Sequence, residues 1–243
     1  MKKNDIVYIL KENPPVNELR YSIRSVVKYF PYSRIIFAGG CPKEIIPDRH
    51  ISVQRAGGAK WKKATNNIKA ACLDANVSED FWLFNDDFFV MKPIKAMQPI
   101  FHGTLENRVK EIYLNNGRNS DYARRLDYTN TELKHLGFKT LNYAVHIPML
   151  VNKEKALQIF EVFPNNPMFR SLYGNYWDIG GRDMKDVKVN IIREEETSWN
   201  KRSRFLSTSN KAFNEGTVGN YIRESFPEPT RYERGERRKN ETD

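Results

Sequence analysis

The first 85 residues alternate short apolar runs with amphipathic segments, and this alternation restricts the fold more than any other feature of the sequence. Apolar positions at helical spacing predict a helix that Asn17 caps and Pro31 ends, and a second helix is expected over residues 66–75. Short runs rich in β-branched and aromatic residues predict buried strands over residues 6–10, 34–38 and 81–84, with a weaker strand near 50–53. Strands and helices in this order predict an α/β fold with a mostly parallel central sheet and flanking helices.

The second half of the chain is less regular. Residues 115–131 are polar and rich in Asn, Arg and Tyr, which indicates a long loop or an insertion. Asn152 can cap a helix over residues 153–163, and a last helix is expected over about residues 218–225. We therefore expect an irregular, partly helical second half that closes over the sheet.

The chain is strongly basic, with a formal net charge of +10 and a pI near 9.5. This charge suits a polyanionic partner: a nucleic acid, an anionic membrane surface or a phosphate-bearing molecule. Cys41 and Cys72 are too few for a disulfide scaffold. The sequence has no apolar run near the ~20 residues of a membrane span, and its first residues lead into a strand without a signal-peptide pattern. We expect a protein of the cytoplasm or of the inner membrane surface.

An adjacent acidic pair, Asp86 and Asp87, follows a predicted strand and lies between aromatic flanks. Two carboxylates in such surroundings need a cation or strong donors to compensate their charge. A hard divalent cation such as Mg²⁺ or Mn²⁺ prefers oxygen ligands and bridges to phosphates, so the pair is a candidate metal site. The alternative is a solvated turn in a hairpin.

Polar residues follow two of the predicted strands, where ligands gather in parallel sheets: Lys11 after the first strand and Asn85 after the last. Arg20 and Arg24 lie four residues apart and share one face of the first helix. They can hold phosphate oxygens, or they can form a solvated face that pairs with Glu18.

Two further residues occupy unusual settings. His146 lies in an apolar segment, where it is either a satisfied core residue or an acid–base group that needs a partner. Arg170 lies between Phe169 and Ser171 and can be a phosphate clamp or part of a structural ion pair.

Taken in order, these motifs resemble the Stealth family of hexose-1-phosphate transferases. Members of that family make phosphodiester-linked capsular polysaccharides in bacteria and include the lysosomal-enzyme phosphotransferase of animals. The resemblance runs from about residue 5 to residue 233. Its segments are residues 18–25, Phe84-Asn85-Asp86-Asp87-Phe88, His146-Ile147-Pro148, Phe169-Arg170-Ser171 and residues 226–233.

The resemblance implies a glycosyltransferase-A-like sheet, a nucleotide-sugar donor (a UDP-sugar first), Mg²⁺ or Mn²⁺ as cofactor, and a polymer acceptor. It assigns Asp86 and Asp87 to the metal, and it assigns His146, Asp87 and Arg170 to catalysis. It also favours donor phosphate binding by Arg20 and Arg24. We further assign Lys11, Asn67, Asn85 and Ser171 to donor binding.

We expect a single catalytic domain over residues 1–233. Its donor-binding half would be residues 1–100, and its acceptor half, closing over the donor, residues 101–233. Residues 234–243 would form a basic tail.

Two departures from the family pattern leave the reaction open. The family usually opens with a stretch that carries a Trp and a second Asp, whereas Asp5-Ile6-Val7-Tyr8 is followed here by Ile9 and Leu10. Ser209-Asn210 stands where the family carries an Asn-Asp pair. Sugar-1-phosphate transfer and ordinary glycosyl transfer, onto a glycan, a teichoic-type polymer or a DNA base, therefore both remain. From another class, a non-catalytic nucleic-acid-binding protein would need its basic residues in one contiguous patch.

Overall fold

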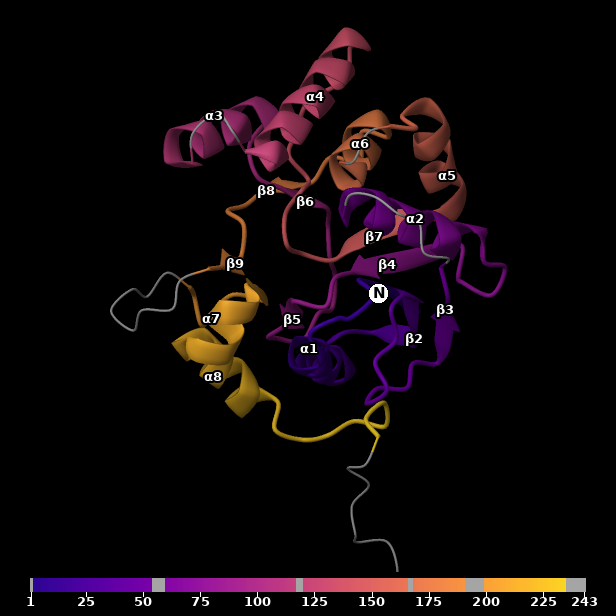
Figure 1. Cartoon of the computed structure of the whole chain (residues 1–243), viewed down its shortest axis with the longest axis vertical. Coiled ribbons are helices and arrows are strands. Elements are labelled where there is room, and N and C mark those ends of the chain that lie inside the picture. Colours follow the sequence, from indigo (N-terminus) through magenta and orange to yellow (C-terminus); the bar gives the residue numbers. More distant parts are fainter. Residues whose placement is uncertain (1, 54–59, 117–119, 166–167, 191–198, 235–243) are drawn as a thin grey trace, which may run out of the picture.

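The computed structural model describes residues 2–53, 60–116, 120–165, 168–190 and 199–234, and its centre is a β-sheet flanked by helices (Figure 1). The strands of this sheet are β1 (Asn4–Leu10), β2 (Tyr32–Gly39), β3 (Arg49–Ile51), β4 (Asp80–Phe84) and β7 (Met149–Asn152). Within the described ranges their order is β3-β2-β1-β4-β7. Only β7, at one edge, runs antiparallel to its neighbour. The predicted α/β class with a mostly parallel sheet is confirmed.

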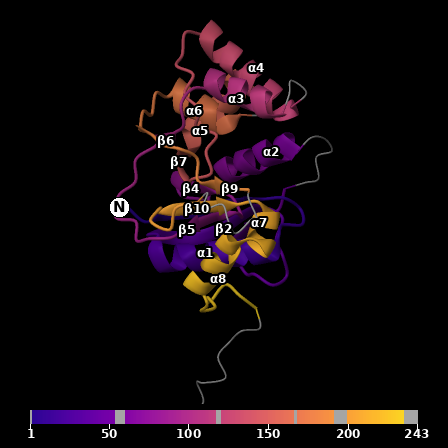
Figure 2. The same ribbon diagram turned by 90° about the vertical axis from the view of Figure 1, so that its left-hand side faces the viewer.

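Helices cover both faces of the central sheet (Figure 2). On one face lies α1 (Val16–Tyr29), and on the other lie α2 (Lys60–Leu73), α5 (Lys153–Val162) and α6 (Phe169–Tyr176). Successive side chains of a strand point to opposite faces. Tyr8 and Phe84 therefore pack in the core on the α1 side, while Val7 and Leu83 pack on the α2 side. Burial on both faces explains the continuous apolar runs of these strands.

The helix limits follow the sequence signals in part. Asn152 caps α5 as predicted, because its side chain accepts a hydrogen bond from the Lys155 N–H. The predicted cap of α1 is wrong: the helix begins at Val16, and Pro15 stands at the N-cap without a side-chain hydrogen bond. Proline has a fixed φ and no N–H to leave unpaired, so it suits this position. The second helix also begins earlier than expected, at Lys60.

The polar stretch over residues 115–131 is not a loop. It includes the end of α3 (Leu105–Asn116) and most of α4 (Asp121–His135), with Ser120 as the N-cap of α4. Along α4, Ala123, Leu126 and Leu133 recur at helical spacing and are buried. The many polar residues belong to the exposed face, and their number concealed this narrow apolar stripe.

A second, smaller sheet joins the two halves of the chain. Its strands are β5 (Phe88–Val90), β9 (Lys188–Val189) and β10 (Phe205–Thr208), in the order β5-β10-β9 within the described ranges. Against it pack α7 (Asn210–Glu215) and α8 (Thr217–Ser225), the latter close to the predicted bounds. The remaining strands, β6 (Ile100–Phe101) and β8 (Arg182–Asp183), pair in parallel. The small sheet brings β9 and β10 next to the segment that leaves β4.

Cys41 is exposed and Cys72 is buried, and both are free thiols. Within the described ranges, none of the helices has both the length and the apolar character that a membrane crossing requires.

Candidate active site

The acidic pair lies in the turn that carries the chain from β4 to β5. This turn is not a hairpin, because β4 belongs to the central sheet and β5 to the small one. Asp86 and Asp87 are partly buried at the carboxyl end of β4. Burial, together with the charge of Asp87, raises the pKa of Asp86 to about 6. The structure therefore places two carboxylates at the sheet edge where parallel α/β folds bind ligands.

Asp87 makes different contacts with its two oxygens. Its Oδ2 accepts hydrogen bonds from Ser207 Oγ at 3.1 Å and from Lys188 Nζ. Lys188 also donates to the carbonyl oxygen of Thr208 at 2.5 Å. The Oδ1 of Asp87 is buried and has no hydrogen-bond partner among the described residues. This orphaned oxygen points to a missing cation or donor.

Glu18 is a site residue that the sequence does not reveal. Only 3% of it is exposed, and it accepts hydrogen bonds from Thr208 Oγ1 at 3.2 Å and from Asn210 Nδ2 at 3.4 Å. Burial and then the charge of Asp87 raise its pKa to about 7. In the sequence Glu18 looks like a surface partner for nearby arginines. The residues that donate these hydrogen bonds lie 190 and 192 positions further along the chain, so no local sequence pattern could indicate them.

His146 has the partner that an acid–base group needs. Its Nδ1 lies 2.7 Å from Asp186 Oδ2, and its backbone N–H donates to Asp186 Oδ1 at 3.0 Å. Burial raises the pKa of Asp186, but the hydrogen bonds from His146 outweigh this and hold the pKa below the ordinary value. The pairing orients the imidazole and leaves Nε2 for a substrate. The sequence singles out His146 but gives no sign of Asp186.

His146 opens into a cleft of about 380 Å³ that Asn85, Arg170 and Lys188 also line. Arg170, on α6, donates to the carbonyl oxygens of Ile147 at 2.7 Å and Leu83 at 3.3 Å. Burial lowers its pKa to about 10. Within the described ranges no carboxylate lies within ion-pair distance of it, but the charges of Asp87 and Asp186 act on it and favour its cationic form. A cationic cleft of this kind suits a phosphate group.

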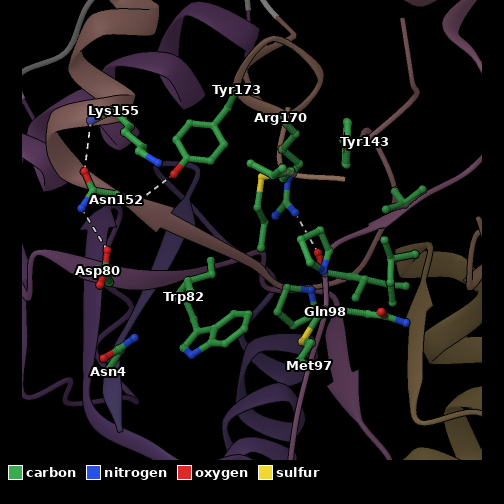
Figure 3. Close-up of a pocket in the computed structure, with 18 of the residues that line it drawn as sticks. Asn4, Asp80, Trp82, Met97, Gln98, Tyr143, Asn152, Lys155, Arg170 and Tyr173 are labelled. Atoms are coloured by element: carbon green, nitrogen blue, oxygen red, sulfur yellow. Dashed lines mark hydrogen bonds between the residues drawn. The ribbon is translucent and has the colours of Figure 1, made fainter. Parts of the chain in front are cut away.

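Arg170 also borders a second cavity of about 480 Å³, between the edge strand β7 and residues 97–100. Figure 3 shows Arg170 and Tyr173 on one side of this cavity, with Trp82 and Met97 opposite. Ser171, the next residue of α6, does not line either cavity. Its buried hydroxyl accepts a hydrogen bond from the Tyr143 N–H at 3.2 Å. Ser171 therefore fixes the segment that leads to His146.

Lys11 and Asn67 lie together in another pocket, of about 350 Å³, at the carboxyl ends of β1 and β2. Asn67 Nδ2 donates to the carbonyl oxygen of Leu10 at 2.9 Å. A Cβ on Gly39, whose φ is +106°, would lie 2.2 Å from that same oxygen, and one on Gly40 would lie 2.1 Å from the carbonyl oxygen of Lys11. Only glycine allows this close backbone approach. The positive charge of Lys11 also acts on Asp86, so the pocket adjoins the acidic pair.

Arg20 and Arg24 lie elsewhere. Arg24 forms a buried two-pronged ion pair with Glu233, at 2.9 and 2.6 Å, and donates to the carbonyl oxygens of Phe226 and Pro227. Arg20 Nε lies 3.4 Å from Glu233. Neither arginine lines the cleft or the Lys11 pocket. This geometry gives both arginines a structural partner in the C-terminal segment. Their role in binding the donor phosphate stays a prediction.

The fold and the site together describe an α/β protein with an acidic pair, a His–Asp dyad and a cationic cleft at one sheet edge. No protein-family model matches the chain. The chain is 22% identical over 188 residues to the capsular polysaccharide phosphotransferase LcbA of Aeromonas hydrophila, a match that covers 73% of this chain and 49% of that protein. The chain thus spans about half the length of this curated relative. The similarity supports the resemblance to the Stealth family.

The chain also shows a low level of similarity to solved structures. Two crystal structures of the galactosyltransferase LgtC, one an active-site mutant and one in complex with donor and acceptor sugar analogues, are each 12% identical to this chain. Each matches 93% of this chain and 96% of its own, with a TM-score of 0.47. The glycosyltransferase GlyE of Streptococcus pneumoniae is 8% identical, covers 93% of this chain and 50% of its own, and has a TM-score of 0.35. Similarity at this level says nothing about shared chemistry.

Proposed function

We propose that the chain is a transferase that uses a nucleotide-activated sugar and passes a sugar-1-phosphate to a hydroxyl group of a glycan or related polymer. The observation that carries this proposal is the cleft that the His146–Asp186 dyad and the cationic Arg170 line together, beside Asp86 and Asp87. A base and an anion-binding cation at one edge of a sheet are what attack on a phosphate requires. The similarity to LcbA supports the same reaction class.

The donor would lie across two of the cavities. The pocket of Lys11 and Asn67 is also lined by Gly39 and Gly40, and we assign it to the nucleoside part of the donor. Its diphosphate would then pass Lys11 towards Asp86, and the sugar phosphate would reach the cleft of Arg170 and His146. A UDP-sugar is our first choice of donor.

A divalent cation, Mg²⁺ or Mn²⁺, fits this arrangement only in part. Within the described ranges no cluster of three or more His, Cys, Asp or Glu side chains has the geometry of a metal site. The orphaned Oδ1 of Asp87, next to Asp86, nevertheless offers the oxygen ligands that such a cation prefers. We propose that Asp86 and Asp87 would hold the cation together with donor phosphate oxygens. Its contribution, when bound, is to neutralise charge on the leaving phosphate.

Three residues of the cleft, His146, Asp186 and Arg170, have separate roles in the transfer step. His146 Nε2 takes the proton of the acceptor hydroxyl while Asp186 holds Nδ1 and stabilises the imidazolium. The acceptor oxygen forms a bond to the phosphorus that carries the sugar, and the bridging phosphorus–oxygen bond of the diphosphate breaks. Arg170 stabilises the charge that develops on the transferred phosphate. A nucleoside monophosphate leaves.

Ordinary glycosyl transfer is the second candidate, and Asn210 is the observation that favours it. A neutral amide at this position donates to Glu18 and supplies no carboxylate to the site. The bond broken would then be the one between the sugar carbon and the phosphate oxygen, and a nucleoside diphosphate would leave.

Slow hydrolysis of the donor, with water as the acceptor, distinguishes the two reactions without knowledge of the true acceptor. A panel of UDP-sugars would be incubated with the protein and Mn²⁺, and the products resolved by chromatography. Phosphoryl transfer to water yields UMP and a sugar-1-phosphate, whereas glycosyl transfer yields UDP and the free sugar. We expect UMP.

His146→Gln should slow this hydrolysis by about 10²–10⁴-fold, the usual contribution of a positioned base. The matched control is His135→Gln, because His135 is an exposed residue in the last turn of α4. UDP as the product would favour the second candidate. An unchanged rate in His146→Gln, or no binding of any UDP-sugar, would contradict the proposed site.

A further inference from the structure

Lys188 occupies a position at the acidic pair that the chemistry above does not use. Its ammonium contacts Asp87 Oδ2 and donates to the carbonyl oxygen of Thr208, and only 19% of its side chain is exposed. Ser207 donates to the same Asp87 oxygen. A lysine held by a carboxylate and a carbonyl in this way is a fixed positive charge inside the site.

The Lys188 ammonium lies where it would repel a metal ion bound to Asp87. A divalent cation on the unpartnered Oδ1 would lie on the same carboxylate as the Lys188 ammonium, and two cations so close together repel strongly in a partly buried site. The repulsion is relieved if the ammonium leaves Oδ2. The carboxylate can then turn both of its oxygens towards the metal.

We propose that Lys188 is an internal counter-ion of Asp87 that a divalent cation must displace. This inference rests on the proposed metal site at Asp86 and Asp87 and goes beyond it. In the free protein Lys188 compensates the charge of Asp87 and keeps the affinity for the metal low.

The displaced ammonium of Lys188 can move into the neighbouring cleft. Lys188 lines the same cleft as His146 and Arg170, so its flexible side chain can turn towards a phosphate bound there. A diphosphate therefore offers Lys188 a new partner at the moment when the metal removes the old one. Metal and nucleotide bind with positive coupling, and each should increase the affinity of the other by the same factor.

Titration of the free protein with Mn²⁺, followed by electron paramagnetic resonance of the unbound ion, tests this without any enzymatic activity. We expect Lys188→Met to bind Mn²⁺ at least tenfold more tightly than the unmodified protein. Lys188→Arg keeps the positive charge and should bind weakly. Lys185→Met is the matched control, since Lys185 is exposed and lies three positions earlier, and it should change nothing. Saturating UDP should tighten Mn²⁺ binding more in the unmodified protein than in Lys188→Met.

The possible outcomes separate this inference from the proposed function. If Asp87→Asn abolishes Mn²⁺ binding but Lys188→Met binds no more tightly than the unmodified protein, the counter-ion role is overturned and the metal site stands. If none of these proteins shows Mn²⁺ binding that depends on Asp87, the metal site and the counter-ion role both fail. Thermal unfolding would confirm that each variant folds. If Lys188→Met does not fold, Lys188→Gln, which is a smaller change in polarity, is used in its place.

Discussion

At the scale of single residues, the site concentrates ionisable groups that oppose one another. Burial and the charges of Asp87 and Asp86 raise the pKa of Glu18 to about 7, and similar causes raise that of Asp86 to about 6. The sequence predicts the acidic pair, because two carboxylates between aromatic runs are conspicuous. It does not predict Glu18, Lys188 or Asp186, because each becomes a site residue through a partner that is distant in the chain.

The raised pKa of Glu18 makes the stability of the protein depend on pH. The folded state holds the proton of Glu18 more tightly than the unfolded state, whose pKa stays near the ordinary 4.5. Below about pH 4.5 both states are protonated and the group has no effect. As pH rises towards 7 the unfolded state ionises first, so the free energy of unfolding falls.

Glu18→Gln should remove this dependence. Relative to the unmodified protein, the variant should become more stable between pH 5 and pH 8, by about 3 kcal/mol at most. Urea unfolding at several pH values measures the difference. Glu154→Gln, an exposed glutamate in the first turn of α5, should show no such trend. Parallel curves for Glu18→Gln and the unmodified protein would show that Glu18 titrates normally.

At the scale of secondary structure, the sequence predicts elements whose apolar pattern is dense and misses those whose pattern is sparse. The strands β1, β2 and β4 are continuous apolar runs buried on both faces, so they are unmistakable. In α4 the buried positions Ala123, Leu126 and Leu133 are apolar, but Thr129 and Asn130 between them are polar. Its polar face dominates the composition, which is why residues 115–131 look like a loop. Tertiary contact, rather than local preference, decides such a helix.

Leu126→Ala tests whether α4 is a packed helix or a surface insertion. Leu126 is fully buried, so the truncation should lower the free energy of unfolding by about 2–5 kcal/mol. Leu114, on the neighbouring α3, is 86% exposed, and Leu114→Ala should change stability by no more than about 0.5 kcal/mol. Urea unfolding measures both. Equal and small effects would mean that α4 does not pack as described.

At the scale of the whole molecule, the last described segment of the chain packs against the segment that follows β2. The Ile46 N–H donates to the carbonyl oxygen of Tyr232, and the Arg234 N–H donates to that of Glu44, so the C-terminal segment lies along the segment that follows β2. Arg24 joins α1 to the same segment through Glu233. The sequence shows the charges of Arg20 and Arg24 but not their partner, and a phosphate and a buried glutamate are equally good explanations of two arginines. Only the fold decides between them.

Glu233→Gln tests whether the partner of Arg24 is the buried Glu233 or a donor phosphate. Arg24 and Glu233 are both buried, with 5% and 2% of their side chains exposed, so the variant removes a buried carboxylate that the Arg24 guanidinium contacts with two of its nitrogens. We expect the free energy of unfolding to fall by about 3–5 kcal/mol, and the affinity for a UDP-sugar to stay unchanged while the protein remains folded. Glu215→Gln, an exposed change in α7, is the control and should leave stability unaltered. If Arg24 instead binds the donor phosphate, its release from Glu233 should raise the affinity for the UDP-sugar and lower the free energy of unfolding only slightly. Calorimetric titration measures the affinity, and urea unfolding measures the stability.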